Sequence, residues 1–362
     1  MAYERPSIQR MHGYVPGKQP SSSETIKLNT NENPYPPSDA VLQALRAVTP
    51  EQLRRYPEPL AEAFRAAAAA LHGVGIDQIV AVNGGDELLR LAITTFVEPG
   101  SPIGVLTPSY SLYPVLAAVH DSPVVSVPAE SDFSVPKNFA QRMNEAGVNL
   151  TLLVNPHAPS GLLTSAAGIA ELARELQGVL LVDEAYVDFV DPELRHELIS
   201  LLREHDNVLL LRTLSKGYSL AGLRYGYGLG PAALIEPLLT KTRDSYNVDA
   251  ISQRLATAAI CDQASAQRSW RAVRNERTRV RSALQALHFQ VPQSHTNFVL
   301  AEAPNHTLPA VELQKRLEAR GVLVRYFAEP RLDGALRITI GTPEQNDKLL
   351  SALHELLAAE RG

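Results

Sequence analysis

The 362-residue chain has one cysteine, no excess of basic residues and no long apolar run. A single cysteine, Cys261, cannot form an intramolecular disulfide, so nothing in the sequence ties the chain to an oxidising compartment. The 34 basic and 39 acidic residues leave a net charge of −5, which predicts neither a nucleic-acid surface nor a polybasic membrane signal. The longest aliphatic runs, such as Val179–Val182, are too short to span a bilayer, and the first residues lack the apolar core of a secretory signal. We therefore expect a cytoplasmic protein that binds neither nucleic acid nor membrane.

Several catalytic signatures are also missing. The sequence has no P-loop and no His-Glu-x-x-His zinc motif, and no set of His and Cys residues has metal-ligand spacing. The glycines between Gly226 and Gly230 are spaced wrongly for a dinucleotide-binding fingerprint. The segment that begins at Gly217 lacks the last glycine of a hydrolase nucleophile elbow. The sequence therefore predicts no metal site.

Short aliphatic strands alternate with helical segments through the middle of the chain. The expected strands are 79–82, 103–106, 124–127, 150–154, 179–182, 208–211 and 225–229, with helices such as 87–97 and 165–176 between them. This alternation predicts an α/β fold, with a mostly parallel sheet and helices on both of its faces.

The two ends of the chain have different patterns. The first thirty residues are rich in Pro, Gly and Ser without a period, which predicts an extended arm. A long polar helix near 264–287 is followed by strands at 298–301, 322–325 and 336–340, by a helix at 309–320, and by a last helix from 344, which predicts a small α+β domain. We therefore divide the chain into an arm (1–30), a large domain (31–285) and a small domain (286–362).

Polar clusters follow the expected strands, at the edge of an α/β sheet where ligands bind. Gly84 and Gly85 begin a helix after a strand, so their backbone N–H groups suit an anion, although a simple turn would use the same residues. The loop from Asn155 to Gly161 is made rigid by its prolines and glycine, which is typical of a binding loop but also of a plain connection.

Two clusters carry charged residues. Asp183 follows an apolar strand, where a carboxylate is costly unless it faces a cation; a helix cap is the alternative. Lys216 follows another strand beside hydroxyl residues, where burial would lower its pKa and favour the neutral, nucleophilic amine. Arg224 suits bidentate binding of phosphate. Most lysines in turns are surface residues, so this motif alone leaves that alternative open.

Taken in this order, the clusters resemble the fold-type I aminotransferases of the aspartate aminotransferase superfamily, and within them the histidinol-phosphate aminotransferases. The similarity covers nearly the whole chain. It is carried by the segments Tyr14–Gly17, Leu28–Tyr35, Arg55–Pro59, Asp183–Tyr186, Arg212–Lys216, Ala221–Arg224 and Leu336–Thr339. The resemblance implies a homodimeric pyridoxal 5′-phosphate (PLP) enzyme that transfers an amino group from histidinol phosphate to 2-oxoglutarate.

The resemblance also implies roles for single residues. Lys216 would carry the cofactor as a Schiff base and shuttle a proton, Asp183 would face the ring nitrogen, and Tyr186 would donate to the ring oxygen O3′. Tyr56 would reach the cofactor phosphate of the partner subunit. The other cofactor-binding candidates are Gly85, Asp86, Tyr110, Asn155, Thr213, Ser215 and Arg224. The substrate-binding candidates are Arg337, Arg325, Tyr14 and Asn31.

One position departs from the family pattern. The family loop commonly reads N-P-N-N-P-T-G and places an asparagine against O3′, whereas this chain has Ala158 there. The contact must then come from elsewhere, with Tyr186 as the principal donor and Asn155 or His157 as candidate second partners. Arg325 is ambiguous in another way, because an exposed residue of an edge strand would look the same in the sequence.

Two alternatives stay open at this point. Relatives on the same scaffold transaminate aromatic or other amino acids, or decarboxylate threonine phosphate. A non-catalytic PLP-binding domain of a regulator would be expected to follow an N-terminal DNA-binding domain, of which the sequence gives no sign.

Overall fold

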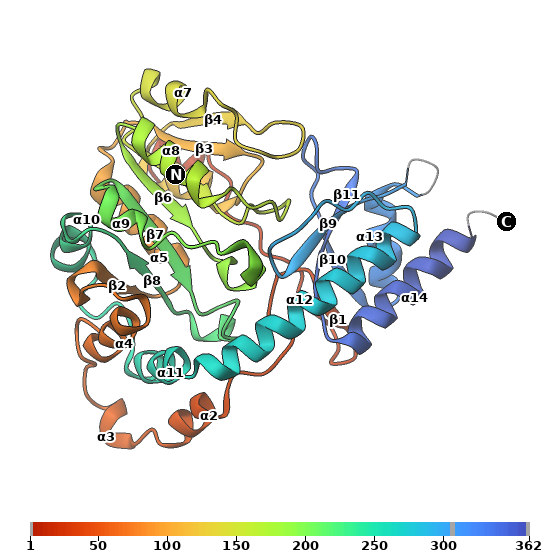
Figure 1. Cartoon of the computed structure of the whole chain (residues 1–362), viewed down its shortest axis with the longest axis horizontal. Coiled ribbons are helices and arrows are strands. Elements are labelled where there is room, and N and C mark those ends of the chain that lie inside the picture. The colour runs from red at the N-terminus through yellow and green to blue at the C-terminus, as the bar shows by residue number, and fades with distance from the viewer. Residues whose placement is uncertain (1–2, 305–307, 360–362) are drawn as a thin grey trace.

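A seven-stranded sheet is the framework of the computed structural model, which describes residues 3–304 and 308–359 (Figure 1). Residues 1–2 of the expected arm, and 305–307 and 360–362 of the expected small domain, lie outside the described residues. In spatial order the strands are β2 (Ile79–Val82), β8 (Gly226–Leu229), β7 (Val208–Thr213), β6 (Val179–Asp183), β5 (Leu150–Val154), β3 (Ile103–Thr107) and β4 (Val124–Pro128). Within this sheet only β8 runs antiparallel to its neighbours, so the prediction of a mostly parallel sheet is confirmed.

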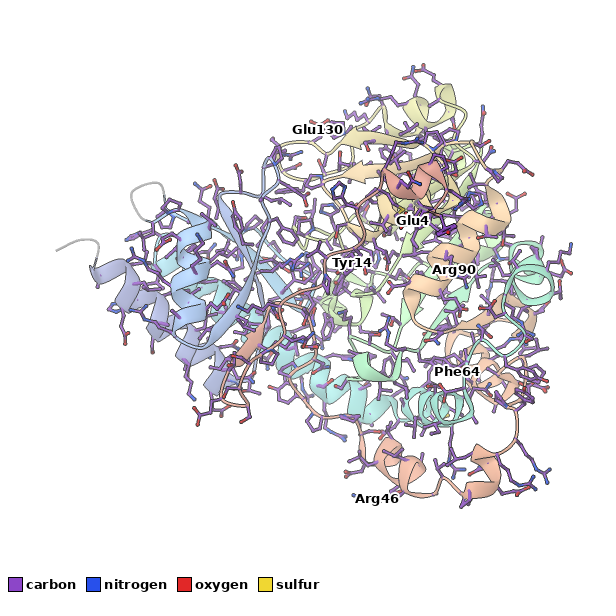
Figure 2. All side chains as sticks on the ribbon, turned by 180° about the vertical axis from the view of Figure 1, so that it is seen from behind. Glu4, Tyr14, Arg46, Phe64, Arg90 and Glu130 are labelled. Carbon is purple, nitrogen blue, oxygen red and sulfur yellow. The ribbon has the colours of Figure 1, made fainter. Side chains whose placement is uncertain are left out.

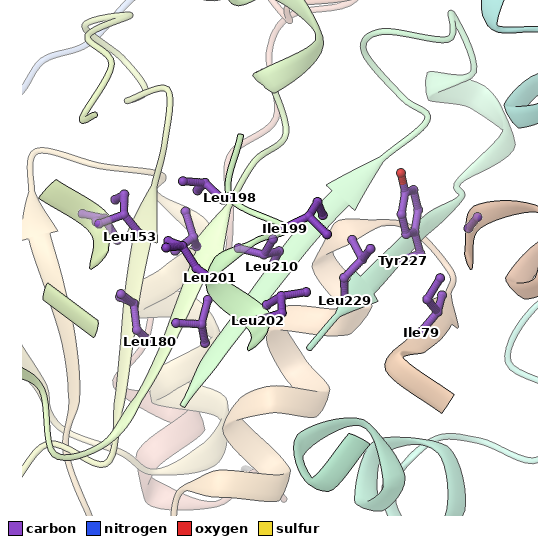
Figure 3. Close-up of a cluster of buried hydrophobic side chains, with 14 of the residues drawn as sticks. Ile79, Leu153, Leu180, Leu198, Ile199, Leu201, Leu202, Leu210, Tyr227 and Leu229 are labelled. Carbon is purple, nitrogen blue, oxygen red and sulfur yellow. The ribbon is translucent and has the colours of Figure 1, made fainter. Parts of the chain in front are cut away.

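Helices cover both faces of this sheet, because its strands are apolar on both sides. One face packs against α4 (Glu62–His72), α7 (Phe139–Glu145), α8 (Ala166–Glu175), α9 (Leu201–Glu204) and α11 (Ala250–Cys261). Figure 3 shows part of this layer, where Leu201 and Leu202 lie over Leu180 and Leu210 of the sheet. The other face packs against α5 (Gly85–Phe96), α6 (Leu112–His120) and α10 (Ala232–Pro237). Beside α11 lies α2 (Asp39–Arg46), which is followed by the short α3 (Pro50–Leu53).

A second, four-stranded sheet forms the core of the small domain. Its order is β1 (Ile26–Leu28), β10 (Val322–Tyr326), β11 (Ala335–Thr339) and β9 (Phe298–Glu302), packed against α13 (Ala310–Ala319) and α14 (Pro343–Ala359). The strand β1 belongs to the segment that the sequence predicts to be an extended arm. It pairs in parallel with β10 and buries Leu28, but three residues are too few to show a periodic pattern in the sequence.

The rest of the arm crosses from the large domain to the small one. Its first helix, α1 (Pro6–Gln9), lies against α6, where Arg5 donates to the carbonyl of Val119. Figure 2 shows Glu4 at the large domain and Tyr14 near the middle of the molecule. Lys18, further along the arm, forms an ion pair with Glu318 on α13, so the arm contacts both domains.

The helix α12 (Gln263–Ala286) connects the two domains (Figure 1). Ala266, near its start, belongs to the core of the large domain, whereas Val273, Val280 and Leu284 belong to that of the small domain. The division of the chain at residues 30 and 285 remains our proposal; within it, β1 of the arm and the second half of α12 pack on the small domain. No helix of the described residues is long and apolar enough to cross a membrane.

Candidate active site

One pocket collects most of the residues that the sequence singles out. It lies between the two domains, at the carboxyl ends of β5, β6 and β7, where α/β sheets bind their ligands. The predicted residues that line it are Tyr14, Asn31, Gly85, Asp86, Tyr110, Asp183, Tyr186, Thr213, Ser215, Lys216, Arg224, Arg325 and Arg337. The predicted residues that do not line it are Asn155 and Tyr56.

Lys216 follows β7 and points into the pocket with its stem buried. Its Nζ donates to the carbonyl oxygen of Thr30 at 3.0 Å. Burial, together with the charges of Arg337 and Arg224, lowers the pKa of this amine to about 8. A part of the population is therefore neutral near physiological pH, and the neutral amine is the form that attacks a carbonyl carbon.

Asp183 is the last residue of β6 and is almost fully buried. Its Oδ2 accepts a hydrogen bond from the hydroxyl of Tyr113 at 3.0 Å, and its Oδ1 accepts one from the N–H of Ala185 at 3.1 Å. Burial raises the pKa of this carboxyl to about 6, against the effect of these two donors. Among the described residues no basic side chain forms an ion pair with Asp183, so its carboxylate is suited to a cationic ligand.

The adjacent Glu184 has a different role. Its side chain is fully buried and forms an ion pair with Arg212 at 2.9 Å, and it is not among the residues that line the pocket. Two consecutive carboxylates thus differ in environment, because successive side chains of an extended segment point to opposite sides. Only Asp183 is available to a ligand.

The first turn of α5 forms an anion-binding corner with the loop after β7. Gly84 has a φ of +78°, a conformation that favours glycine, and the guanidinium of Arg224 lies against it. The buried side chains of Thr213 and Ser215, whose hydroxyl oxygens are 2.8 Å apart, line the same pocket. A helix N-terminus, an arginine and two hydroxyls provide the donors that a phosphate group accepts.

Aromatic side chains close the pocket on the side of the arm. Tyr110 donates to Oδ1 of Asp86 at 3.3 Å and meets the ring of Tyr113 edge-on at 5.6 Å. Tyr14 of the arm lies against Tyr110, with the ring centroids 6.1 Å apart. Tyr14 and Tyr110 thus line this side of the pocket with aromatic rings.

The two predicted substrate arginines lie opposite each other in the small sheet. Arg325 on β10 and Arg337 on β11 are cross-strand partners in an antiparallel pair. Arg337 lies between the rings of Phe298 and Phe327, at 5.2 and 5.3 Å; its Nη2 donates to the carbonyl of Asn29, and its buried Nε has no partner among the described residues. Like charges directly opposite are unfavourable without an anion between them. The pair is therefore a site for an anionic group.

The environment of Arg325 differs from the edge-strand alternative. Because β1 pairs with β10, Arg325 lies on an internal strand, half-buried, with Nη2 donating to the carbonyl of Val15 at 3.4 Å. The sequence could not show this, since it depends on a three-residue strand almost 300 positions away.

Ala158 lines the pocket, and the two residues suggested as its substitutes are bonded elsewhere. The side chain of Asn155 accepts from the N–H of Thr164 at 2.8 Å and donates to its carbonyl at 3.1 Å. The ring of His157 is bonded to Ser160 at 2.7 Å and to the carbonyl of Pro108 at 2.9 Å. Both side chains therefore hold the loop in place, and the role of Asn155 in cofactor binding stays a prediction.

Tyr56 does not line this pocket in its own chain. It is in the turn between α3 and α4, 80% exposed, with its ring stacked on that of Tyr246 at 4.5 Å.

Other pocket residues are missing from the sequence-based list. They are Gly17, Asn29, Thr30, Leu89, Ser109, Ser111, Val154, Pro159, Ala185, Leu211, Phe327, Glu329 and Leu332. Tyr113, which does not line the pocket itself, is also missing, although it contacts Asp183 directly; a tyrosine in an apolar helix gives no signal of such a contact in the sequence. Within the described residues no group of three His, Cys, Asp or Glu side chains could hold a metal ion.

Comparison with known proteins identifies relatives over the full length of the chain. The model of the family "Aminotransferase class I and II" matches residues 23–353. Histidinol-phosphate aminotransferase 1 of Trichormus variabilis is 42% identical over 98% of this chain and 99% of that protein. Histidinol-phosphate aminotransferase 2 of Psychrobacter arcticus is 41% identical over 95% of this chain and 93% of that protein.

A solved structure has the same fold. The histidinol-phosphate aminotransferase of Sinorhizobium meliloti, a complex with pyridoxal 5′-phosphate, matches with a TM-score of 0.90, covering 99% of this chain and 98% of that one. The two sequences are 24% identical.

Proposed function

This chain belongs to the class I and II aminotransferases, and on that basis we propose that it transfers the amino group of histidinol phosphate to 2-oxoglutarate, with pyridoxal 5′-phosphate as cofactor. The products would be imidazole-acetol phosphate and glutamate. The observation that carries the proposal is the meeting, in one pocket, of a buried amine, an unpaired buried carboxylate and an anion-binding corner. Each of these matches one chemical group of the cofactor.

The residues present fit this cofactor. The carboxylate of Asp183 would bind the protonated ring nitrogen, the one cationic group of PLP. The N-terminus of α5, with Thr213, Ser215 and Arg224, would bind the phosphate. Lys216, between these two places, would hold the aldehyde carbon, and Tyr110 would cover a face of the ring.

When bound, PLP supplies an aldehyde that takes up the amino group and an electron-withdrawing ring that stabilises negative charge at the substrate carbon. Side chains of the protein would transfer the proton and keep the ring protonated. Lys216 would remove the proton from that carbon and return it one position away, because its lowered pKa lets the amine act as a base near neutral pH. Asp183 would keep the ring nitrogen protonated, since a neutral ring withdraws electrons less strongly.

The arginine pair supports a phosphate-bearing donor. A phosphate monoester is close to dianionic near neutral pH and has three acceptor oxygens, so it favours two cations over one. Arg337 has an unused buried donor, Arg325 faces it across the strand pair, and Tyr14 lines the same pocket. The carboxylates of 2-oxoglutarate could use the same two cations in the second half of the reaction.

We also propose that the active unit is a homodimer in which Tyr56 reaches the cofactor phosphate of the partner subunit. Tyr56 is exposed and does not line the pocket of its own chain, which supports this. The isologous symmetry of a homodimer would then create two composite sites.

A panel of amino donors tests the substrate assignment. The purified protein is loaded with PLP and mixed with 2-oxoglutarate and, in turn, histidinol phosphate, phenylalanine, tyrosine, aspartate or threonine phosphate; glutamate and carbon dioxide are measured. We expect glutamate formation with the highest kcat/KM for histidinol phosphate. Preference for an aromatic amino acid, or carbon dioxide release from threonine phosphate, would refute the substrate assignment and leave the family unchanged. Lys216→Ala is the control for uncatalysed exchange.

A further inference from the structure

Asn31 lies at the point where the arm, the small sheet and the pocket meet. It is 2% exposed, and its backbone has a left-handed φ of 57°. Its carbonyl oxygen accepts a hydrogen bond from Nδ2 of the fully buried Asn297 at 2.9 Å, which fixes the main chain. Although Asn31 was a candidate for substrate binding, both ends of its side-chain amide are bonded to protein groups.

Thr339 determines which way this amide faces. The Thr339 hydroxyl oxygen accepts from the backbone N–H of Asn31 at 3.0 Å, and its own hydrogen goes to Oδ1 of Asn31 at 3.1 Å. If the amide were reversed, that hydroxyl hydrogen would have no acceptor among the described contacts, in a place where Thr339 is 2% exposed. The amide N–H₂ must therefore face away from Thr339.

The N–H₂ group of Asn31 then points at Tyr186. Nδ2 donates to the phenol oxygen at 2.9 Å. Because that oxygen is already an acceptor, and no described group accepts from it, the phenol hydrogen is free to be donated into the pocket. The Tyr186 ring cannot turn away easily, since it is buried and packs edge-on against Phe298 with centroids 5.1 Å apart.

The free hydrogen of Tyr186 matters because Ala158 occupies the position of the usual asparagine donor. Ala158 offers no hydrogen bond to a ligand, and Asn155 and His157 are committed to the loop. Of the side chains considered for the ring oxygen of the cofactor, Tyr186 is the one whose hydrogen remains free.

We infer that Asn31 is a positioning residue: held by Thr339, it directs the Tyr186 O–H toward the ring oxygen of the cofactor and makes Tyr186 the donor there. This inference rests on the proposed function. It also connects substrate binding to the cofactor, because Thr339 and Arg337 lie two residues apart on β11 and so share one face of the strand. The strand that binds the anionic group of the substrate also sets the hydrogen bond at the ring.

The test measures the pKa of the Lys216 nitrogen when it is bound to the cofactor. The visible absorption of the PLP-loaded protein is titrated with pH, and the midpoint of its change is compared among variants. Asn31→Asp would accept the phenol hydrogen and withdraw it from the ring oxygen, which should raise the midpoint by about one pH unit. Thr339→Val adds no charge but allows the side-chain amide of Asn31 to reverse. It should therefore also raise the midpoint, by a smaller amount than Asn31→Asp does. Thr339→Ser keeps the hydroxyl and should restore the wild-type midpoint.

A double variant separates the hydrogen bond from a plain charge effect. The titratable and charged groups that act on the Tyr186 phenol are Arg337, Asp183 and Tyr14, and all are left in place. In Tyr186→Phe the midpoint should already be raised, and adding Asn31→Asp should change it little more. If Asn31→Asp shifts the midpoint equally with and without the tyrosine, the new charge acts directly and the inference is wrong. Equal midpoints for wild type and Thr339→Val would also overturn it.

Cofactor loading separates this inference from the proposed function. If the wild type binds PLP, and borohydride attaches the cofactor to Lys216, the proposed cofactor role stands whatever the Asn31 variants do. If the wild type binds no PLP, the proposed function fails and the inference fails with it.

Discussion

Replacement of Asp183 by asparagine should affect the cofactor-free fold and the loaded enzyme in opposite directions. In the cofactor-free protein, burial raises the pKa of this carboxyl from 3.8 to about 6. A carboxyl with a raised folded-state pKa binds its proton more tightly when folded, so its contribution to stability is largest below pH 4 and is lost as the pH rises through 6. Two pKa units correspond to about 3 kcal/mol by pH 7.

Asp183→Asn removes this cost while keeping the contacts. The amide can still accept from the N–H of Ala185, and the Tyr113 hydroxyl can reverse to accept from the amide nitrogen. We therefore expect the cofactor-free variant to be more stable than the wild type, by about 1 kcal/mol at pH 4.5 and up to about 3 kcal/mol near pH 7. Urea unfolding of both cofactor-free proteins at several pH values measures the difference.

The loaded enzyme should respond in the other direction. A charge pair at about 4 Å in a partly buried site contributes about 4 kcal/mol, so loss of the carboxylate should lower kcat by about 10³-fold. Asp86→Asn, which removes a half-exposed carboxylate from the same pocket, is the control for the unfolding series. The reasoning is refuted if cofactor-free Asp183→Asn is no more stable than the wild type at pH 7, or if its loaded form turns over at the wild-type rate.

The remaining predictions concern the amine, the arginine pair and the dimer. Borohydride reduction of the loaded protein should attach the cofactor to the peptide that contains Lys216, and mass spectrometry that finds the label on another lysine would contradict this. Lys216→Ala should still bind PLP but lose about 10⁴-fold in kcat, because the base is gone. Arg337→Ala should lower kcat/KM by about a hundredfold or more for both histidinol phosphate and 2-oxoglutarate, and Arg325→Ala should harm these two more than a neutral monocarboxylate amino acid; steady-state kinetics with each substrate decide. Tyr56→Ala should weaken PLP binding, and mixed dimers with Lys216→Ala subunits should regain one normal site; a fully active monomer in analytical ultracentrifugation would exclude the shared site.

The local sequence was enough to predict most of the strands and helices of the large domain. Strands such as 79–82 match the observed β2 because a strand buried on both faces is apolar throughout, which is visible in four residues. The boundaries of α12 were close to the predicted 264–287 for a similar reason, since a helix of that length repeats its apolar side many times. The antiparallel direction of β8 was not predicted, because alternating strands and helices do not state which way each strand runs.

The sequence predicted those site residues whose side chains are rarely buried without a partner. A lysine and an aspartate after buried strands carry that signal by themselves, and the pocket collects both. Tyr113 carried none, because a tyrosine in an apolar helix is ordinary until its hydroxyl is seen 3.0 Å from Asp183. The same is true of β1, whose three residues became a strand only through their pairing with β10.

The sequence by itself therefore determined the fold class, the family resemblance and the chemistry of the main candidates, because each depends on local composition and order. The tertiary structure alone decided how distant groups meet. It set Arg325 opposite Arg337 through strand register, turned Asn155 and His157 away from the pocket, and joined Thr339, Asn31 and Tyr186 in one hydrogen-bonded row. The direction of a buried hydrogen bond depends on which donors and acceptors its neighbours leave unpaired. Those neighbours are known only from the tertiary structure, because they come from segments about 300 residues apart.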